Sequence, residues 1–316
     1  MTNGQNAPRV SIGIPIYNEE DTIPELGRRL REMIDSLGAA AEVILVNDGS
    51  ADHSLDLLRD LAGADPRFKV VDFSRNFGHQ AALYAAMRRS SGDAVILMDG
   101  DLQDPPEVVP RLLEKWSEGY EVVYAVRRKR KEGILKRAAY SIYYRLLKSV
   151  AYVPIPVDSG DFSLMDRRIV DLVCGMPERN KFLRGLRAWA GFSQTSVEYE
   201  RDARYAGQTK YSLPKLMRLA LDGLISYSFI PLRLAYVAGT VVSLGSFGLA
   251  AVYFFQRLFS DQVIPRGFTT LAVLVLFLGG VQLLTIGVVG EYLGRIYDEV
   301  KKRPEYVERE TIGFHD

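Results

Sequence analysis

The sequence has few residues that could cross-link it. It contains a single cysteine, Cys174, so no internal disulfide can form, and the chain suits a reducing compartment. Its three histidines, His53, His79 and His315, are too widely separated to indicate a zinc site. Residues 1–10 are polar and predict no secretory signal peptide.

An excess of charge of one sign is also lacking. Lys plus Arg number 40 against 39 Asp plus Glu. Proteins that bind nucleic acid through a broad basic surface carry more positive charge, so no nucleic-acid partner is expected. Neither the G-x-G-x-x-G nor the G-x-x-x-x-G-K-[ST] phosphate-binding pattern occurs in the sequence. A metal ion and arginines would therefore have to bind any phosphate groups of a ligand.

Charged residues are absent from two long segments, 234–256 and 267–290. Each could cross a hydrocarbon core of about 30 Å as a helix. Buried core helices are the alternative, but they seldom run so long without a charge. The sequence predicts two transmembrane helices within 231–295 of a multi-pass cell-membrane protein. Basic residues at 301–303 place both chain ends on the cytoplasmic side, and small residues in both segments allow a homo-oligomer.

Strands and helices alternate in the first part of the chain. Runs rich in Val and Ile predict strands at residues 10–16, 42–48, 69–74, 93–99 and 121–126. Such alternation implies an α/β fold with a mostly parallel, Rossmann-like sheet covered on both faces. Ligands of these sheets bind at the carboxyl ends of the strands. Between the first two strands, the pattern of residues 21–37 predicts a helix with Asp21 as its N-cap.

Two basic amphipathic stretches follow, at residues 134–150 and 211–230. A helix packed on the sheet is an alternative for the first, but the neighbouring apolar segments favour helices at the membrane surface. The predicted organisation is a cytosolic domain of residues 1–210 that includes the first stretch, a juxtamembrane helix at the second, and two transmembrane helices. A cytosolic tail, residues 296–316, completes it.

Acidic residues gather directly after the fourth predicted strand. In DGDLQD, Asp99, Asp101 and Gln103 alternate along the backbone, so their side chains can point to one side. Mg²⁺ and Mn²⁺ favour such oxygen ligands, which water and substrate phosphates complete. Capping of the next helix is a competing explanation. It suits Asp104, followed by Pro105 at the first helical position, but does not account for the two earlier aspartates.

Polar residues also follow the second and fifth predicted strands. Asp48, in VNDGS, is placed to accept hydrogen bonds from a nucleobase or ribose, although NDGS is also a common turn sequence. The basic run at residues 127–131 could be a solvated loop or a nucleic-acid patch. Its place after a strand favours phosphate binding, above all by Arg127.

Taken in order, these motifs resemble a known family. IPIYNEE, VNDGS and DGDLQDPPE, followed by DSGDFSLMDRR, RYAGQTKYS and VGEYLGRIYDEVKKRPEY, are similar to the inverting family 2 glycosyltransferases of the GT-A fold. Within that family the chain resembles the polyprenyl-phosphate glycosyltransferases, bacterial relatives of dolichol-phosphate mannose synthase, from Val10 to Tyr306.

The resemblance implies an enzyme that moves a hexose from a nucleotide sugar to polyprenyl phosphate, with Mg²⁺ or Mn²⁺ as cofactor. In a bacterium the acceptor would be undecaprenyl phosphate at the cytoplasmic face of the membrane. UDP-glucose is the first expectation for the donor. GDP-mannose, UDP-N-acetylglucosamine or a modified arabinose donor are the alternatives.

The resemblance also implies roles for matching positions. Contacts to the nucleotide sugar are expected from Pro15, Tyr17, Asn18, Glu19, Asp48, Asp99 and Gln103. Metal ligands are expected at Asp99, Asp101 and Gln103. Phosphate contacts are expected from Arg127, Arg137, Arg204 and Lys210. Asp158 would be the acid nearest the reacting centre, with Asp101 as its catalytic companion. A lipid phosphate is largely ionised at neutral pH, so Asp158 is expected to orient the acceptor or assist weakly.

Three rival functions fit the sequence less well. A processive polysaccharide synthase would need more transmembrane helices and a Q-x-x-R-W motif, which the sequence lacks. A transporter subunit would carry ionisable residues inside its apolar segments. A non-catalytic nucleotide-binding membrane subunit would have no need of the predicted metal and phosphate ligands together.

Overall fold

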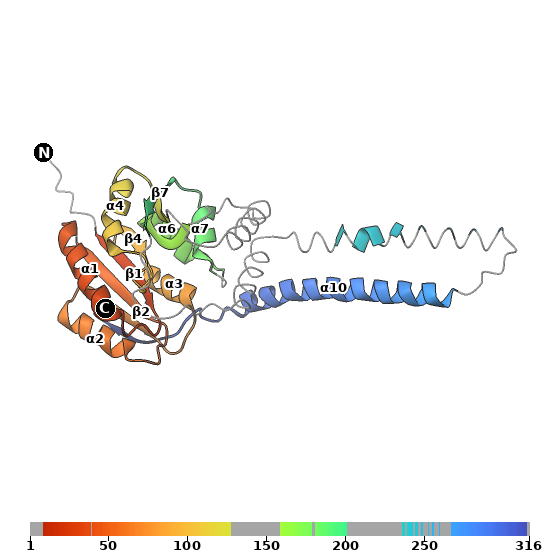
Figure 1. The fold of residues 1–316 in the computed structure, drawn as a ribbon, viewed down its shortest axis with the longest axis horizontal. Helices are drawn as coiled ribbons and strands as arrows, with labels where there is room; N and C mark the ends of the chain where they lie inside the picture. Colours follow the sequence, from red (N-terminus) through yellow and green to blue (C-terminus); the bar gives the residue numbers. More distant parts are fainter. Residues whose placement is uncertain are drawn as a thin grey trace. The chain divides into compact units, whose positions relative to one another are not determined.

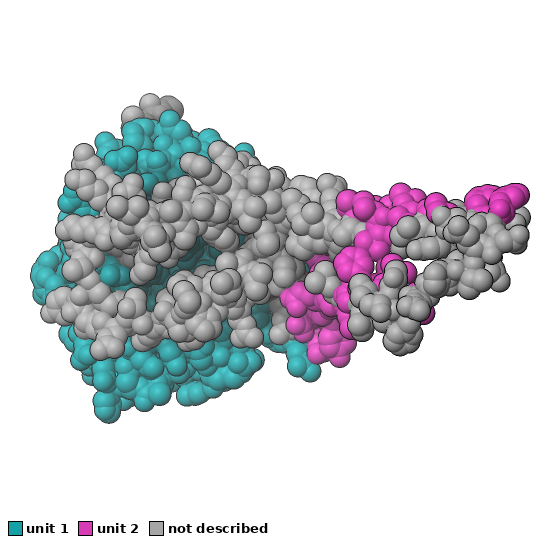
Figure 2. Space-filling view, turned by 45° about the vertical axis from the view of Figure 1, so that its right-hand side comes forward, with its two compact units in different colours: residues 1–148, 153–210, 303–316 teal, residues 149–152, 211–302 magenta. Residues whose placement is uncertain are grey.

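The structure is a computed structural model, and two compact units make up the chain. One unit comprises residues 1–148, 153–210 and 303–316, and the other comprises residues 149–152 and 211–302 (Figure 2). The structure describes residues 9–38, 40–127, 159–178, 181–200 and 267–314, with scattered positions between 236 and 259. The predicted helices at 134–150 and 211–230, and most of the first predicted span, lie outside the described residues.

An eight-stranded sheet with the order β7-β5-β6-β4-β1-β2-β3-β8 is the frame of the first unit (Figure 1). Its strands are β1 (Val10–Ile16), β2 (Ala41–Asn47), β3 (Phe68–Phe73), β4 (Ala94–Leu97), β5 (Val122–Arg127), β6 (Ser159–Asp166), β7 (Gln194–Tyr199) and β8 (Glu308–Ile312). Only β6 and β8 run against the others. The predicted mostly parallel sheet is therefore a mixed sheet. The five predicted strands are confirmed to within two residues at each end.

The sequence-based prediction missed three strands. β6 lies in the middle of the sheet, antiparallel to both β4 and β5. β7 pairs in parallel with β5 at one edge, and β8 pairs antiparallel with β3 at the other. Residues 296–316, predicted to be a tail, thus include a strand of the sheet.

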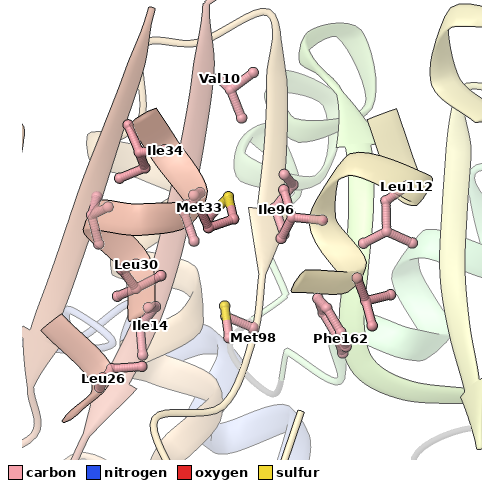
Figure 3. Packing of buried hydrophobic residues seen from close by; sticks show 14 of the residues in the cluster. Val10, Ile14, Leu26, Leu30, Met33, Ile34, Ile96, Met98, Leu112 and Phe162 are labelled. Carbon is pink, nitrogen blue, oxygen red and sulfur yellow. The ribbon is translucent and has the colours of Figure 1, made fainter. Parts of the chain in front are cut away.

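Helices cover both faces of the sheet. The first face carries α1 (Ile23–Leu37), α2 (Ser54–Ala64) and α4 (Val109–Ser117), preceded by the 3-10 helix η1 (Pro106–Val108). The second face carries α3 (His79–Arg89), α6 (Arg167–Gly175) and α7 (Leu183–Trp189). The core on the first face is larger, and Figure 3 shows residues of α1 and α4 in it beside residues of the strands.

Helix α1 follows from its apolar spacing and from its ends. Leu26, Leu30, Met33 and Ile34 recur at intervals of three or four and are buried in the core of the first face. Burial of each such side chain stabilises the fold by about 1.5–3 kcal/mol. Gly38 ends the helix in the left-handed conformation, at φ 61°.

The predicted N-cap of this helix, Asp21, is wrong. The residue at the N-cap is Thr22, whose side chain makes no capping bond. The carbonyl of Glu19 instead accepts hydrogen bonds from the amides of Thr22 and Ile23, at 2.9 and 3.1 Å. A preceding turn therefore satisfies the helix start, and no side-chain cap is needed there.

A buried carboxylate ties the amino ends of the strands together. Glu42, at the start of β2, accepts hydrogen bonds from Ser11 and Ser91 through Oε1, while Lys69 donates to its Oε2 at 2.6 Å. Burial alone would raise the pKa of this carboxyl, but these donors outweigh that effect and hold the pKa below its ordinary value. Both of its oxygens have donors, so the contacts of Glu42 stabilise the amino end of the sheet.

The longest helix among the described residues is α10 (Phe268–Lys301), with 34 residues and a length of about 51 Å. Within the described part of the chain, one segment, Phe277–Lys301, is long and apolar enough to cross a membrane. Many of its apolar side chains, such as Leu283 and Ile286, are exposed. The second predicted span thus falls on a helix, and the two-span topology stays a prediction.

Candidate active site

Three parallel strands bring the predicted nucleotide and metal residues to one edge of the sheet. β1, β2 and β4 are neighbours, and Asp48 and Asp99 each follow the end of a strand in this group. Gly100 lies close to β1, because a Cβ atom there would approach Ile16 Cδ1 to 2.6 Å. The loop after β4 therefore packs directly on the end of β1, where Tyr17 is exposed and Pro15 is buried within the strand.

The loop after β1 is fixed by hydrogen bonds to the loop after β2. Asn18 has a left-handed backbone, at φ 53°. Its amide donates to Ser50 Oγ at 3.0 Å, and its Oδ1 accepts from the amide of Ala51 at 2.8 Å. The amide of Glu19 donates to Ser54 Oγ at 2.9 Å. A non-glycine residue in this conformation costs about 1–3 kcal/mol, and such strain is often retained where a ligand binds.

Asp48 joins the loop after β2 to the loop after β3. Its carboxylate accepts hydrogen bonds from the amides of Phe77 and Gly78, at 2.7 and 3.0 Å. Burial raises the pKa of Asp48 even though both amides favour the charged form. A carboxylate has about four acceptor positions, so capacity remains for a ligand hydroxyl or base. Asp48 is thus a loop-organising residue, which the sequence did not indicate.

Asp99 carries one of three buried side-chain polar atoms that have no hydrogen-bond partner among the described residues. Its Oδ1 atom is buried and has no hydrogen-bond partner. Burial raises the pKa of this carboxyl to about 6. The neighbouring Leu102 has a left-handed backbone at φ 57°, and the amide of Gln103 donates to Asp101 Oδ1 at 3.1 Å. A buried carboxylate oxygen without a donor suits a cation, which would supply the missing interaction.

Metal binding at this loop would need ligands besides the acidic side chains of the described residues. Within the described ranges, no group of three or more His, Cys, Asp or Glu side chains is arranged to hold a metal ion. Mg²⁺ is commonly held by one or two carboxylates together with water and substrate phosphates, so the loop fits an ion that arrives with a phosphorylated ligand.

A second buried acid, Asp161 on β6, is surrounded by donors. Arg184 donates to both of its oxygens, at 2.7 and 3.0 Å, and Gln80 donates to Oδ2 at 3.3 Å. The imidazole Nε2 of His79 lies 3.4 Å from Asp161 Oδ2 and 3.5 Å from Asp99 Oδ1. His79 therefore lies between the acids of β4 and β6.

The charges of this cluster shift the pKa of each member. Burial alone would raise the pKa of Asp161, but Arg184 and His79 outweigh it and hold that pKa far below its ordinary value. Burial likewise lowers the pKa of His79, and the two acids outweigh that effect and raise it. Asp161 is thus a permanently charged organising group. The sequence offered one signal for His79: it begins the helix after β3, at the edge where the acids lie.

The predicted capping role of Asp104 is wrong. The N-cap of η1 is Pro105, and that of α4 is Val108. Asp104 is buried and accepts a hydrogen bond from the hydroxyl of Tyr199, whose oxygen accepts one from Arg127 Nε at 3.3 Å. Burial lowers the pKa of Arg127, but Tyr199 and the nearby acids outweigh it and raise the pKa, so this guanidinium stays charged beside the acidic loop.

Several predicted residues cannot be placed. Arg137, Asp158, Arg204 and Lys210 lie outside the described residues. Their phosphate-binding and catalytic roles stay predictions. The described part of the site consists of the loops after β1, β2 and β4 and the cluster around Asp161.

Comparisons with known proteins agree with this architecture. The family described as Glycosyl transferase family 2 matches residues 11–173. An uncharacterized glycosyltransferase of Bacillus subtilis, YkcC, is 47% identical over 307 residues, which cover 97% of this chain and 95% of that protein. The bactoprenol glucosyl transferase of Shigella phage SfII is 42% identical over 301 residues, or 95% and 97% of the two chains.

One solved structure illustrates the more distant similarities. Glucosyl-3-phosphoglycerate synthase from Mycobacterium tuberculosis, crystallised with Mn²⁺, uridine diphosphate and phosphoglyceric acid, aligns with a TM-score of 0.48 and 21% identity, over 69% of this chain and 76% of its own. A similarity at that level identifies neither a substrate nor a metal for the present chain. The family match, which covers more than half of the sequence, and the nearly full-length relatives show that this chain is a glycosyltransferase of family 2, with the Rossmann-like mixed sheet of the GT-A fold.

Proposed function

We propose that this enzyme transfers a glucosyl group from UDP-glucose to a polyprenyl phosphate, with inversion at the anomeric carbon. Relatives that align with nearly the whole chain are named bactoprenol glucosyl transferases, in Shigella phages SfII and SfV among others. The same chemistry with another nucleotide sugar is the alternative. In a bacterium the acceptor would be undecaprenyl phosphate.

The observation that carries the chemistry is the buried Oδ1 atom of Asp99, which accepts no hydrogen bond and has His79 Nε2 3.5 Å away. Together with Asp101 and Gln103 on the same loop, Asp99 would hold Mg²⁺ or Mn²⁺. When bound, the ion neutralises charge that grows on the leaving diphosphate. The nucleoside would be held beside the metal by the loop after β1 and by Asp48, which follows β2. Ligands of such sheets bind at the carboxyl ends of the strands.

The transfer is a single displacement. An oxygen of the acceptor phosphate forms a bond to the anomeric carbon as the bond from that carbon to the diphosphate oxygen breaks, and UDP leaves. The acceptor oxygen is already ionised at neutral pH, so no strong base is required. Arg127, with the predicted phosphate ligands outside the described residues, would bring the anionic acceptor to the anionic donor. Asp158 would orient the acceptor.

A lipid acceptor fits the apolar part of the chain. The enzyme would be anchored in the cell membrane through two spans, the second within α10, with its sheet domain in the cytosol. A homo-oligomer is consistent with the small residues of these segments.

The proposal is tested with the full chain purified in detergent and supplied with undecaprenyl phosphate and Mg²⁺. Radiolabelled UDP-glucose, UDP-N-acetylglucosamine and GDP-mannose are offered separately, and label is followed into the lipid fraction. We expect transfer from UDP-glucose that EDTA abolishes. Transfer from another donor would change the sugar, and no lipid labelling from any of the three donors would contradict the proposed transfer of a glucosyl group.

The metal assignment has its own variant. Asp101→Asn is expected to abolish transfer while the circular dichroism spectrum and membrane insertion stay unchanged. The matched control is Asp56→Asn, which changes an exposed acid on α2. Normal transfer by Asp101→Asn, or an equal loss in the control, would contradict the assignment.

A further inference from the structure

We propose that the segment after α10, residues 303–308, positions the groups that hold Asp161, so that Glu305 and Lys181 are positioning residues of the active site. The inference deepens the proposed function and rests on it for its kinetic consequence. Three sets of contacts, all within the described residues, carry it.

The first set surrounds Lys181. This residue is only 5% exposed, and its Nζ donates to the carbonyl of Met176 at 2.7 Å. The same atom lies 3.4 Å from Glu305 Oε1 and 3.9 Å from the centre of the Tyr84 ring. A buried ammonium is strongly destabilised when its counter-charge is removed. Glu305 therefore fixes Lys181 where it is.

The second set leads from Lys181 to the acid. Lys181 lies two positions before Leu183, where α7 begins. The amide of Leu183 donates to Gln80 Oε1 at 3.1 Å, and Gln80 donates to Asp161. Arg184, the next residue of α7, makes the two-point contact with Asp161. A shift of Lys181 would therefore move Arg184 and, through the amide of Leu183, Gln80, which are two of the groups that bind this carboxylate.

The third set fixes α3, which supplies His79 and Gln80. Tyr306 stacks on Phe73 with ring centres 4.8 Å apart, and it meets Tyr84 of α3 edge to face at 6.4 Å. At the other end of α3, Arg89 pairs with Glu308. The segment after α10 thus touches α3 and the start of α7, the two elements that deliver the donors of Asp161.

A purely structural role for this segment makes a different kinetic prediction. A loss of stability alone reduces the amount of active enzyme and leaves the properties of each folded molecule unchanged. Displaced donors around Asp161 would instead lower kcat in folded enzyme. KM for the donor would change little, because the residues proposed to hold the nucleoside follow β1 and β2.

The test uses the full chain in detergent and the variants Glu305→Gln, Lys181→Met, their combination, and the conservative Glu305→Asp. Glu310→Gln is the control, because Glu310 lies on β8 but pairs with Arg59 of α2. We expect kcat, per folded molecule, to fall by about ten- to a hundredfold in each of the first two variants, since small displacements of catalytic groups have effects of that size. In the double variant kcat should fall no further than in the worse single variant, because the two residues act as a pair. Glu305→Asp should recover part of the rate.

Unchanged kcat in Glu305→Gln, additive losses in the combination, or an equal loss in the control would each overturn the inference. Hydrogen exchange separates this result from the proposed function, because it needs no activity. The amides of residues 183–186 should exchange faster in Glu305→Gln than in Glu310→Gln. Equal exchange would overturn the positioning role, whereas a wild-type chain that transfers no sugar would contradict only the proposed function.

Discussion

Each end of the sheet holds a carboxylate with a buried oxygen, Glu42 and Asp99, and the two carboxylates differ in almost every respect. Glu42, at the amino end, has donors on both oxygens and a pKa held below its ordinary value. Asp99, at the carboxyl end, has an oxygen that accepts no hydrogen bond, with His79 Nε2 3.5 Å away, and a pKa raised to about 6. The amino end is complete without a ligand, and the carboxyl end is not.

Backbone strain is distributed in the same way. Among the described residues of the sheet domain, the non-glycine residues with positive φ are Asn18 and Leu102, in the loops after β1 and β4. Strain of this kind persists only where the surrounding structure enforces it, and it gathers at ligand sites. Stability and function are thus separated along the strands: the amino end stabilises the sheet, and the carboxyl end is arranged for a ligand.

Asp99→Asn tests the difference between the two ends of the sheet, and its expected effect is the largest. The substitution removes a proposed metal ligand, so we expect kcat for sugar transfer to fall by roughly 10²–10³-fold, the size seen when one electrostatic contact to a transition state is lost. The thermal unfolding midpoint should change little, because the weakened contact with His79 Nε2, 3.5 Å from Oδ1, is offset by removal of a charge whose Oδ1 accepts no hydrogen bond.

Transfer assays and thermal melts of the full chain measure both quantities. A variant with normal transfer would show that the carboxyl end does not depend on this acid. A marked fall in melting temperature would show that Asp99 stabilises the fold as Glu42 does.

The next largest effect is expected at Gly49, where the loop after β2 closely approaches the loop after β3. A Cβ atom at Gly49, where φ is 65°, would lie 2.5 Å from the carbonyl carbon of Arg75. Gly49→Ala should destabilise the fold by about 3 kcal/mol, since left-handed strain and overpacking add, and it should raise KM for the donor through Asp48. In Gly38→Ala, where nothing lies within 4 Å, only the strain remains, about 1 kcal/mol.

Denaturation and kinetics of the two glycine variants check this pair. If Gly38→Ala raised KM for the donor as much as Gly49→Ala does, the change would not be local to the site. Equal destabilisation would contradict the close approach of the two loops.

Glu42→Gln probes the opposite end. It leaves Lys69 without its buried counter-charge, so the fold should lose about 2 kcal/mol, which lowers the melting temperature by about 4–8 °C in a domain of this size. Neither kcat nor KM for the donor should change in the folded enzyme. A kinetic defect without a melting defect would reverse the roles assigned to the two ends.

The smallest expected effect is the pH dependence of the difference in melting temperature between the wild type and Glu42→Gln. The pKa of Glu42 in the fold lies below its ordinary value of 4.5, so its charged form stabilises the fold above pH 4.5. That contribution is lost as the pH falls through the pKa in the fold. The gap in melting temperature between wild type and Glu42→Gln should therefore be largest near neutral pH and shrink below pH 4.5. A gap independent of pH would show that the contacts of Glu42 do not depend on its charge.

The sequence was informative where local pattern and topology coincide. β1 to β5 are runs of Val and Ile, and their shared direction placed Asp48 and Asp99 at one edge. Local sequence patterns did not predict the strands β6 and β8, whose pairing strands are distant in the chain. β6, in DSGDFSLMD, alternates polar and apolar residues, and β8 is mostly charged. Neither resembles the apolar runs of the first strands.

The cluster around Asp161 shows the same limit. His79, Asp161 and Arg184 are far apart in the chain and meet only because β6 inserts between β4 and β5. No spacing rule predicts that insertion. The capping roles expected of Asp21 and Asp104 failed for a related reason: a backbone turn made the first cap unnecessary, and Tyr199, 95 positions away, bound the second acid.

Calorimetric titration of UDP, with and without Mg²⁺, against the wild-type chain, Asp99→Asn and Glu42→Gln tests the contrast between the two ends most directly. Mg²⁺ should tighten UDP binding by the wild type and by Glu42→Gln, and should have no effect on binding by Asp99→Asn. An undiminished Mg²⁺ effect in Asp99→Asn, or its loss in Glu42→Gln, would contradict the separation of a ligand-binding end from a stabilising end.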